Sequence, residues 1–308
     1  MRTSLKFAAL LIALGCFLNM EAAGQRRGSA RTITVPLTLR SGELARQLQP
    51  ADFTVLENGE AQQVLSVRGI DRAPLALAVL IQDDVVSSVG NDIRGIGAFI
   101  RRQPEGSRVM VGYLRAGSLQ VRQRFTTNAE RAVSALRVPA GVAGIGPYNP
   151  YVQIVEALRR FESVPTGRRA IIVVSDGVDV SRGVDSSSPT QSIDLQRAIN
   201  EAQRRGVAVY SIYAPTAGLT ANGNNILVNN GQSSLTRLSD ETGGRAFFQG
   251  TNAPVSFDPF LRQIDQALSR QLALTYLSTS TRNGFRRLKI ESNVAGLRFE
   301  YPTGVDRK

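Results

Sequence analysis

A run of seven apolar residues occupies positions 75–81 (LALAVLI). A continuous apolar run of this length, bounded by polar residues, is typical of a strand that is covered on both faces of a parallel sheet. The run stops at Gln82-Asp83-Asp84, and an amphipathic pattern that predicts a helix over 91–103 follows it. This part of the chain therefore predicts a buried strand, an acidic loop and a helix, in that order.

The same alternation of strand and helix continues to about residue 271. The predicted strands are 75–82, 107–115, 169–175, 207–214 and 244–249, with an antiparallel edge strand at 119–125, and the helices are 91–103, 128–137, 150–162, 190–205, 233–242 and 257–271. This order predicts an α/β fold with a Rossmann-like, doubly wound, mostly parallel six-stranded sheet. Ligands of such sheets bind at the carboxyl ends of the strands, where Asp84 and Asp176 both lie.

Both ends of the chain outside this region have strand-like alternation. At the N-terminal side it covers 32–40 and a hairpin centred on Asn58-Gly59, which is a strong turn signal. At the C-terminal side it covers three pieces, 272–279, 285–292 and 297–302. Neither set is large enough to bury a face alone, so we expect the two to pair as a small β-sandwich.

The first 24 residues have the order of a secretory signal peptide. Arg2 and Lys6 precede an apolar run too short for a comfortable membrane span, and small residues follow it. We expect a secreted, periplasmic or cell-envelope protein with no transmembrane segment in the mature chain. The expected divisions are a signal peptide (1–24), an N-terminal β segment (25–73), an α/β domain (74–255) and a helix with a C-terminal β segment (256–308).

Composition excludes several kinds of chemistry. The chain has no histidine, and its one cysteine, Cys16, lies in the expected signal peptide. The mature chain therefore has no disulfide, no His-ligated zinc and no Ser-His or Cys-His nucleophile pair. The net charge is +12, but the arginines are spread along the chain in pairs, without a basic run of five. We therefore expect no specific nucleic-acid binding.

The pattern over 74–255 resembles a von Willebrand factor A domain. The resemblance rests on an apolar strand that ends in an acid with serines, a helix, and a second apolar strand that ends in Ser175-Asp176-Gly177. The flanking stretches LQPADFTVLENGEAQQV (48–64) and DETGGRAFF (240–248) are similar to bacterial secreted proteins of the acidobacterial VWFA-related type. With these flanks, the resemblance covers nearly the whole mature chain.

The resemblance implies a metal-ion-dependent adhesion site made of Asp-x-Ser-x-Ser, a later Thr and a second Asp. The matching positions here are Asp84, Ser88, Asn149 and Asp176, and Asp83 with Ser87 gives an alternative register. A valine stands where the first serine is expected in either register, and Asn149 stands in place of Thr. Oxygen ligands of this kind suit Mg²⁺, so the resemblance implies a degenerate site with weak Mg²⁺ binding. We expect Asp179 to be a solvated loop acid.

These observations predict a non-enzymatic, exported module of the adhesion type that recognises a protein or an envelope ligand. The alternative is a carboxylate-based hydrolase that uses Asp84 and Asp176, although the chain has no tryptophan and few aromatic residues in the loops that follow the strands. A dinucleotide-binding enzyme is disfavoured because the first strand-to-helix turn is acidic and lacks the Gly-x-Gly-x-x-Gly spacing. A phosphorelay receiver domain is disfavoured because it needs an acceptor aspartate and a late-strand lysine, which are absent at the required places.

Overall fold

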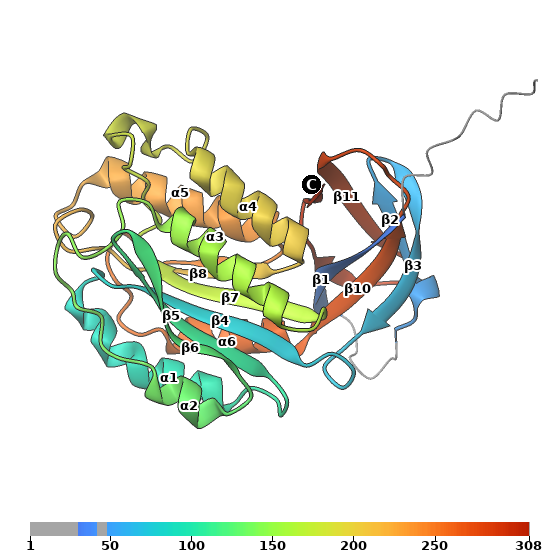
Figure 1. Cartoon of the computed structure of the whole chain (residues 1–308), viewed down its shortest axis with the longest axis horizontal. Helices are drawn as coiled ribbons and strands as arrows, with labels where there is room; N and C mark the ends of the chain where they lie inside the picture. The colour runs from blue at the N-terminus through green and yellow to red at the C-terminus, as the bar shows by residue number, and fades with distance from the viewer. Residues whose placement is uncertain (1–29, 42–47, 308) are drawn as a thin grey trace, which may run out of the picture.

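The computed structural model describes residues 30–41 and 48–307, so the expected signal peptide lies outside the described residues. The described chain forms two sheets that lie beside each other, one flanked by helices and one made almost only of strands (Figure 1). The described helices are too short or too polar to cross a membrane.

The helix-flanked sheet has six strands in the order β6-β5-β4-β7-β8-β9. They are β4 (Leu75–Gln82), β5 (Arg108–Arg115), β6 (Ser118–Thr126), β7 (Arg168–Ser175), β8 (Ala208–Tyr213) and β9 (Ala246–Phe247). Neighbouring strands are parallel except β6, which pairs with β5 in the antiparallel direction. The chain leaves β4 toward β5 on one side and later reaches β7 on the other, so the order reverses between β4 and β7, where open α/β sheets bind ligands.

Helices cover both faces of this sheet (Figure 1). They are α1 (Ile93–Arg101), α2 (Ala129–Ser134), α3 (Pro150–Arg160), α4 (Ile193–Arg205), α5 (Asn225–Glu241) and α6 (Asp258–Ser269). Alternate residues of a strand point to opposite faces. Leu77, Val79 and Ile81 accordingly pack with α1, α2 and α6, whereas Ala78 and Leu80 pack with α3 and α4. Burial on both faces explains why β4 has no polar residue before Gln82.

The strands from the two ends of the chain form one seven-stranded sheet, in the order β12-β1-β10-β3-β2-β11-β13. They are β1 (Arg31–Ser41), β2 (Phe53–Glu57), β3 (Glu60–Arg68), β10 (Gln271–Ser278), β11 (Gly284–Ser292), β12 (Arg298–Glu300) and β13 (Gly304–Arg307). The two terminal segments pair directly, but in one sheet rather than in the small β-sandwich that the sequence led us to expect. The single sheet instead encloses its own core, to which β1, β2, β10, β11 and β13 all contribute, including Leu37, Val55 and Tyr276.

The buried arginine Arg168 ties the two sheets together. It begins β7, and its guanidinium donates to the backbone carbonyls of Leu268, of Gln271 (2.8 Å) and of Ala73 (3.4 Å). The amino ends of the parallel strands therefore face the seven-stranded sheet. The carboxyl ends lie at the opposite edge, away from that sheet (Figure 1).

Three elements differ from the sequence prediction. Helix α5 begins at Asn225, eight residues before the predicted start, because the Asn224 side chain accepts from the backbone N–H of Leu227 and caps the helix. Leu227 and Val228 are buried there, which offsets the poor helix propensity of the asparagines around them. Strand β9 has only two residues, and the short strand β13 was not predicted at all.

Candidate functional site

The topology brings the acids Asp84 and Asp176 to neighbouring loops. Asp84 follows β4 and Asp176 follows β7, and these strands pair directly from Leu75–Arg168 to Ile81–Val174. Both side chains are buried, with exposed fractions of 7% and 1%. The neutral amide of Gln82 bridges them: its Nε2 lies 3.0 Å from Asp84 Oδ1 and 3.3 Å from Asp176 Oδ1. We call these two hydrogen bonds the amide bridge.

Ser175 sets the orientation of the Gln82 amide. The Ser175 hydroxyl donates to Gln82 Oε1, and its oxygen accepts from the backbone N–H of Gly177 at 3.0 Å. The carbonyl end of the amide is thereby turned toward Ser175, and the NH₂ end toward the two carboxylates. The sequence did not identify Gln82 and Ser175 as site residues, because a polar residue after an apolar run indicates only where the strand ends.

The adjacent acid, Asp83, has cationic partners instead. Its carboxylate accepts two hydrogen bonds from Arg137, at 2.6 and 2.7 Å, and one from the backbone N–H of Ala140 at 3.1 Å. Arg115 forms a further ion pair at 3.2 Å. The Arg137 guanidinium also lies 4.1 Å from the centre of the Tyr113 ring, a cation–π contact. Asp83 is thus a structural acid that positions the loop before α3.

The three acids have different pKa shifts, each with a physical cause. Burial alone would raise the pKa of Asp83, but the bonds from Arg137 and Ala140 and the charge of Arg115 together lower it below the usual value. Burial raises the pKa of Asp84, and the bond from Gln82 offsets this only in part. Burial raises the pKa of Asp176 to about 6, although the hydroxyl of Thr216 donates to it.

The remaining predicted ligands lie in other environments. Ser87 and Ser88 are exposed, in a short 3-10 turn that precedes α1. The Asn149 side chain accepts from the backbone N–H of Tyr151 at 3.0 Å, which caps α3, and its amide donates to Asp194 at 2.8 Å. Asn149 therefore acts as the N-cap residue of α3.

These contacts do not fit the ligand set that the resemblance implies. Mg²⁺ needs about six oxygen ligands in near-octahedral geometry. Between Asp84 and Asp176 stands an N–H donor rather than an oxygen. The backbone of Gly146 also packs so closely on Asp84 that a Cβ atom there would lie 2.0 Å from the carboxylate. No cluster of three or more acidic, histidine or cysteine side chains suited to a metal occurs in the described part of the chain.

Asp179 differs from its expected solvated state. It is buried, and its carboxylate accepts from the hydroxyls of Ser181 and Ser192, both at 2.6 Å. Ser192 also caps α4 by accepting from the backbone N–H of Leu195. Asp179 is therefore a structural residue that fastens the long loop after β7 to the start of α4.

The surface around these acids is built from the loops and first helical turns at the carboxyl ends of the parallel strands, which we call the carboxyl-end face. Its loops are 85–91, 138–149, 177–192, 214–224 and 248–257. Within these bounds three residues are charged, and the flanking loop positions add five more; of these eight, only Arg182 and Asp185 are exposed, Arg137 is half-buried, and the others are the buried acids Asp83, Asp84, Asp92, Asp176 and Asp179. Exposed charge is therefore scarce in these loops.

Exposed apolar side chains gather on the same face. Among the described residues, twelve large hydrophobic side chains are exposed, and nine of them lie on these loops or on the first turn of α3, α4 or α5. The nine are Val138, Val142, Tyr148, Val152, Val184, Ile193, Ile226, Phe248 and Val255. Apolar exposure with few charges is the composition of a protein interface core.

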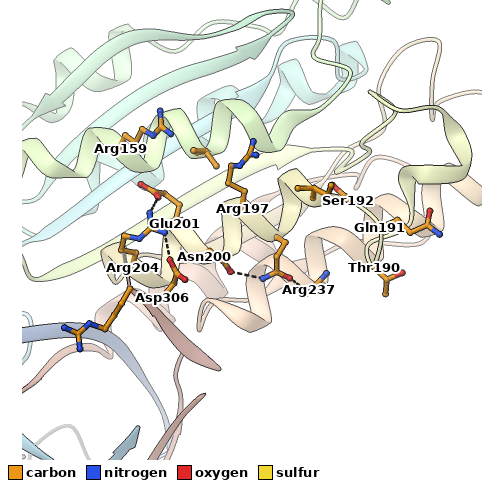
Figure 2. A pocket seen from close by; sticks show the side chains of 14 residues that line it. Arg159, Thr190, Gln191, Ser192, Arg197, Asn200, Glu201, Arg204, Arg237 and Asp306 are labelled. Carbon is orange, nitrogen blue, oxygen red and sulfur yellow. Dashed lines mark hydrogen bonds and ion pairs between the residues drawn. The ribbon is translucent and has the colours of Figure 1, made fainter. Parts of the chain in front are cut away.

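A large groove lies elsewhere, along α4. It measures about 630 Å³ and is bordered by α3, α5 and β13, with none of the predicted site residues among its lining (Figure 2). Two of its arginines have acidic partners inside the chain: Arg204 pairs with Glu201 and Asp306, and Arg237 pairs with Glu241. The groove thus contains the contacts that join α4 to the seven-stranded sheet, and we assign it a structural role.

Comparison with known proteins gives structural likeness only. No protein family matches the chain, and no curated protein does. An aerotolerance-related membrane protein of Bacteroides fragilis has a similar structure, with 14% identity, a TM-score of 0.42, and coverage of 63% of this chain and 98% of that one. The hypothetical protein BatB of Bacteroides thetaiotaomicron has 14% identity, a TM-score of 0.39, and coverage of 64% and 97%.

The VWA domain of SpRpn10 is also similar, with 14% identity, a TM-score of 0.36, and coverage of 53% of this chain and 84% of that one. Independently of these scores, the strand order is that of a doubly wound α/β sheet, with the two acids where the order reverses. The seven-stranded antiparallel sheet is an addition to that fold.

Proposed function

We propose that this chain is a non-enzymatic binding module that docks a protein partner through its carboxyl-end face. The observation that carries the proposal is the concentration of nine exposed large apolar side chains on the loops and first helical turns of this face, whose loops have only two exposed charged residues, Arg182 and Asp185. Interfaces between proteins are depleted of charge at their centre and enriched in aromatic and apolar residues. The face also lies opposite the seven-stranded sheet, so that sheet leaves it free for a partner (Figure 1).

The buried acids support binding rather than hydrolysis. A carboxylate pair that cleaves a glycosidic bond must face the substrate. Asp84 and Asp176 are instead buried, the amide bridge contacts one oxygen of each, and Thr216 donates to the second oxygen of Asp176. We therefore prefer a role in which these residues stabilise the loops, and the exposed side chains around them contact the partner.

Charge-introducing substitutions test the proposed function. Val142 and Tyr148 are 54% and 69% exposed on the carboxyl-end face, and Leu65 and Phe285 are 42% and 52% exposed on the seven-stranded sheet. The mature chain is immobilised, and the protein that it captures from an envelope extract is quantified for each variant. Val142→Asp and Tyr148→Asp should reduce capture of that protein at least tenfold, whereas Leu65→Asp and Phe285→Asp should leave it unchanged. Equal loss in both pairs would refute the assignment of the face.

We also propose that the protein is exported, with residues 1–24 removed. The support is the order of charged, apolar and small residues in that segment. N-terminal sequencing of the native protein should find a start near Gly24 or Gln25, in a fraction outside the cytoplasm. A native protein that retains Met1 would refute this proposal.

A further inference from the structure

We infer that the side-chain amide of Gln82 takes the place of a divalent cation between Asp84 and Asp176, so that this part of the carboxyl-end face is assembled without metal. The inference goes beyond the proposed function, because it concerns the internal chemistry of the face and needs no partner. It rests on the contacts that Gln82, Ser175, Thr216 and Gly146 make around the two acids.

The geometry of the amide bridge matches two N–H donors to two carboxylates. A carboxamide NH₂ group has two N–H donors, and Gln82 directs one to each carboxylate, at 3.0 Å and 3.3 Å. A cation bound by both acids would occupy the same position between them. The amide therefore supplies the positive ends of two N–H dipoles where an ion would supply its charge.

The side-chain amide of Gln82 has one favoured orientation. The oxygen of Ser175 accepts from the backbone N–H of Gly177, which directs the Ser175 hydroxyl proton to Gln82 Oε1. Rotation of the amide by half a turn would place Oε1 against two carboxylates and would bring the NH₂ group toward Ser175. Gln82 and Ser175 are 1% and 0% exposed, so water does not compensate for such a change.

The groups around the amide bridge also favour the amide over an ion. Thr216 donates to the second oxygen of Asp176 at 2.6 Å, and the backbone of Gly146 is in close contact with Asp84. Arg137 and Arg115 neutralise the adjacent Asp83. An entering ion would have to displace the amide and break both of its bonds to the acids.

The test is a cation titration of the mature chain at constant ionic strength. Thermal unfolding is followed with EDTA and then with Mg²⁺ or Mn²⁺ up to about ten millimolar, and bound Mn²⁺ is counted by electron paramagnetic resonance. The variants are Gln82→Glu, which replaces the donor by a third carboxylate, and Gln82→Ala, which removes the bridge. Gln63→Glu is the matched control, because Gln63 is an exposed residue of strand β3.

The wild type and Gln63→Glu should bind no Mn²⁺ and show no Tm change with either ion. Gln82→Glu should lose more than about 5 °C in EDTA, as a cluster of buried carboxylates would require, and should recover most of this loss with Mn²⁺. If Gln82→Glu does not fold, a Tm increase of Gln82→Ala with Mn²⁺ supports the inference in its place. A saturable response of the wild type that Asp176→Asn abolishes, or no response of either Gln82 variant, would overturn it.

Discussion

The side-chain amide of Gln82 lies 3.3 Å from the carboxylate of Asp176, although 94 residues separate them in the chain. The contact exists because β4 and β7 are parallel neighbours, so that residues at their carboxyl ends meet. It places a neutral donor between two buried acids at the point where the strand order reverses. The carboxyl-end face is therefore built on an internal hydrogen-bond network, and its outer surface is apolar.

We predict that Arg137 is the main partner of Asp83. Arg137→Ala leaves the buried Asp83 carboxylate with Arg115 as its only charged partner beside the Ala140 N–H, and should lower the free energy of unfolding by about 3 kcal/mol, as loss of one partner from a buried carboxylate does. Chemical denaturation measures the change. Arg101→Ala is the control, because it breaks an exposed pair with Glu130 and should have little effect. Equal effects of the two substitutions would contradict the role of Arg137.

A methyl group at Gly146 should disrupt the loop that packs on Asp84. Gly146→Ala places its Cβ 2.0 Å from the Asp84 carboxylate, so the loop or the acid must move, at a cost of about 1–3 kcal/mol. Gly167→Ala is the matched control, since its Cβ would meet its nearest atom at 3.6 Å, an ordinary contact. Denaturant midpoints compare the two variants. Equal stability of Gly146→Ala and Gly167→Ala would contradict the close packing of Gly146 on Asp84.

The pH dependence of stability should show the raised pKa of Asp176. Burial raises that pKa to about 6 from an ordinary value of 3.8. The folded state then binds more protons than the unfolded state between these values, so this acid lowers stability as the pH rises from about 4 to about 6. Asp176→Asn removes the titration, so its stability relative to the wild type should rise by about 2.4 kcal/mol between pH 4 and pH 7 in EDTA.

Urea unfolding of both proteins at several pH values gives this difference directly. Acids with lowered pKa values, such as Asp83, make the fold less stable as the pH falls. These acids are present in both proteins, so their contributions cancel in the difference. A difference that stays flat, or that falls as the pH rises, would contradict the buried state of Asp176.

We predict that Arg168 is needed to join the two sheets. Arg168→Met removes the donor to the carbonyls of Gln271, Leu268 and Ala73, which would remain buried without it. The free energy of unfolding should fall by about 3–5 kcal/mol, because these three buried carbonyl groups would lose their donor. Arg108→Met, at the partly exposed start of strand β5 in the same sheet, is the control and should cost much less. Hydrogen exchange should show the extra opening of Arg168→Met at β10 and the start of β7.

The sequence predicted those parts of the site that follow from local pattern. The apolar runs before Asp84 and Asp176 predicted two buried parallel strands, and parallel strands bring the residues that follow them to one edge. The amide bridge could not be predicted in this way, because Ser175 and Gln82 are 93 residues apart and nothing local marks their pairing. Asn149 occupies the aligned ligand position, but the cap of α3 uses its oxygen.

The seven-stranded sheet was also only partly predictable from the sequence. Alternating residues predicted strands at both ends of the chain, but alternation does not specify which strands pair. In the structure β10 lies between β1 and β3, which joins the two ends into one sheet rather than two. Strand β13 has only four residues and includes Asp306 and Arg307, so no apolar pattern marks it.

Site-specific photo-crosslinking tests the central claim, that the carboxyl-end face docks a protein, most directly. A benzophenone amino acid is placed singly at Val142 or Tyr148 on that face, and at Leu65 or Phe285 on the seven-stranded sheet, all of which are exposed. After irradiation of the exported protein in its native envelope, the first two positions should form an adduct with the same partner protein, and the last two should not. Adducts of that partner from the seven-stranded sheet alone, or in equal yield from all four positions, would contradict the account.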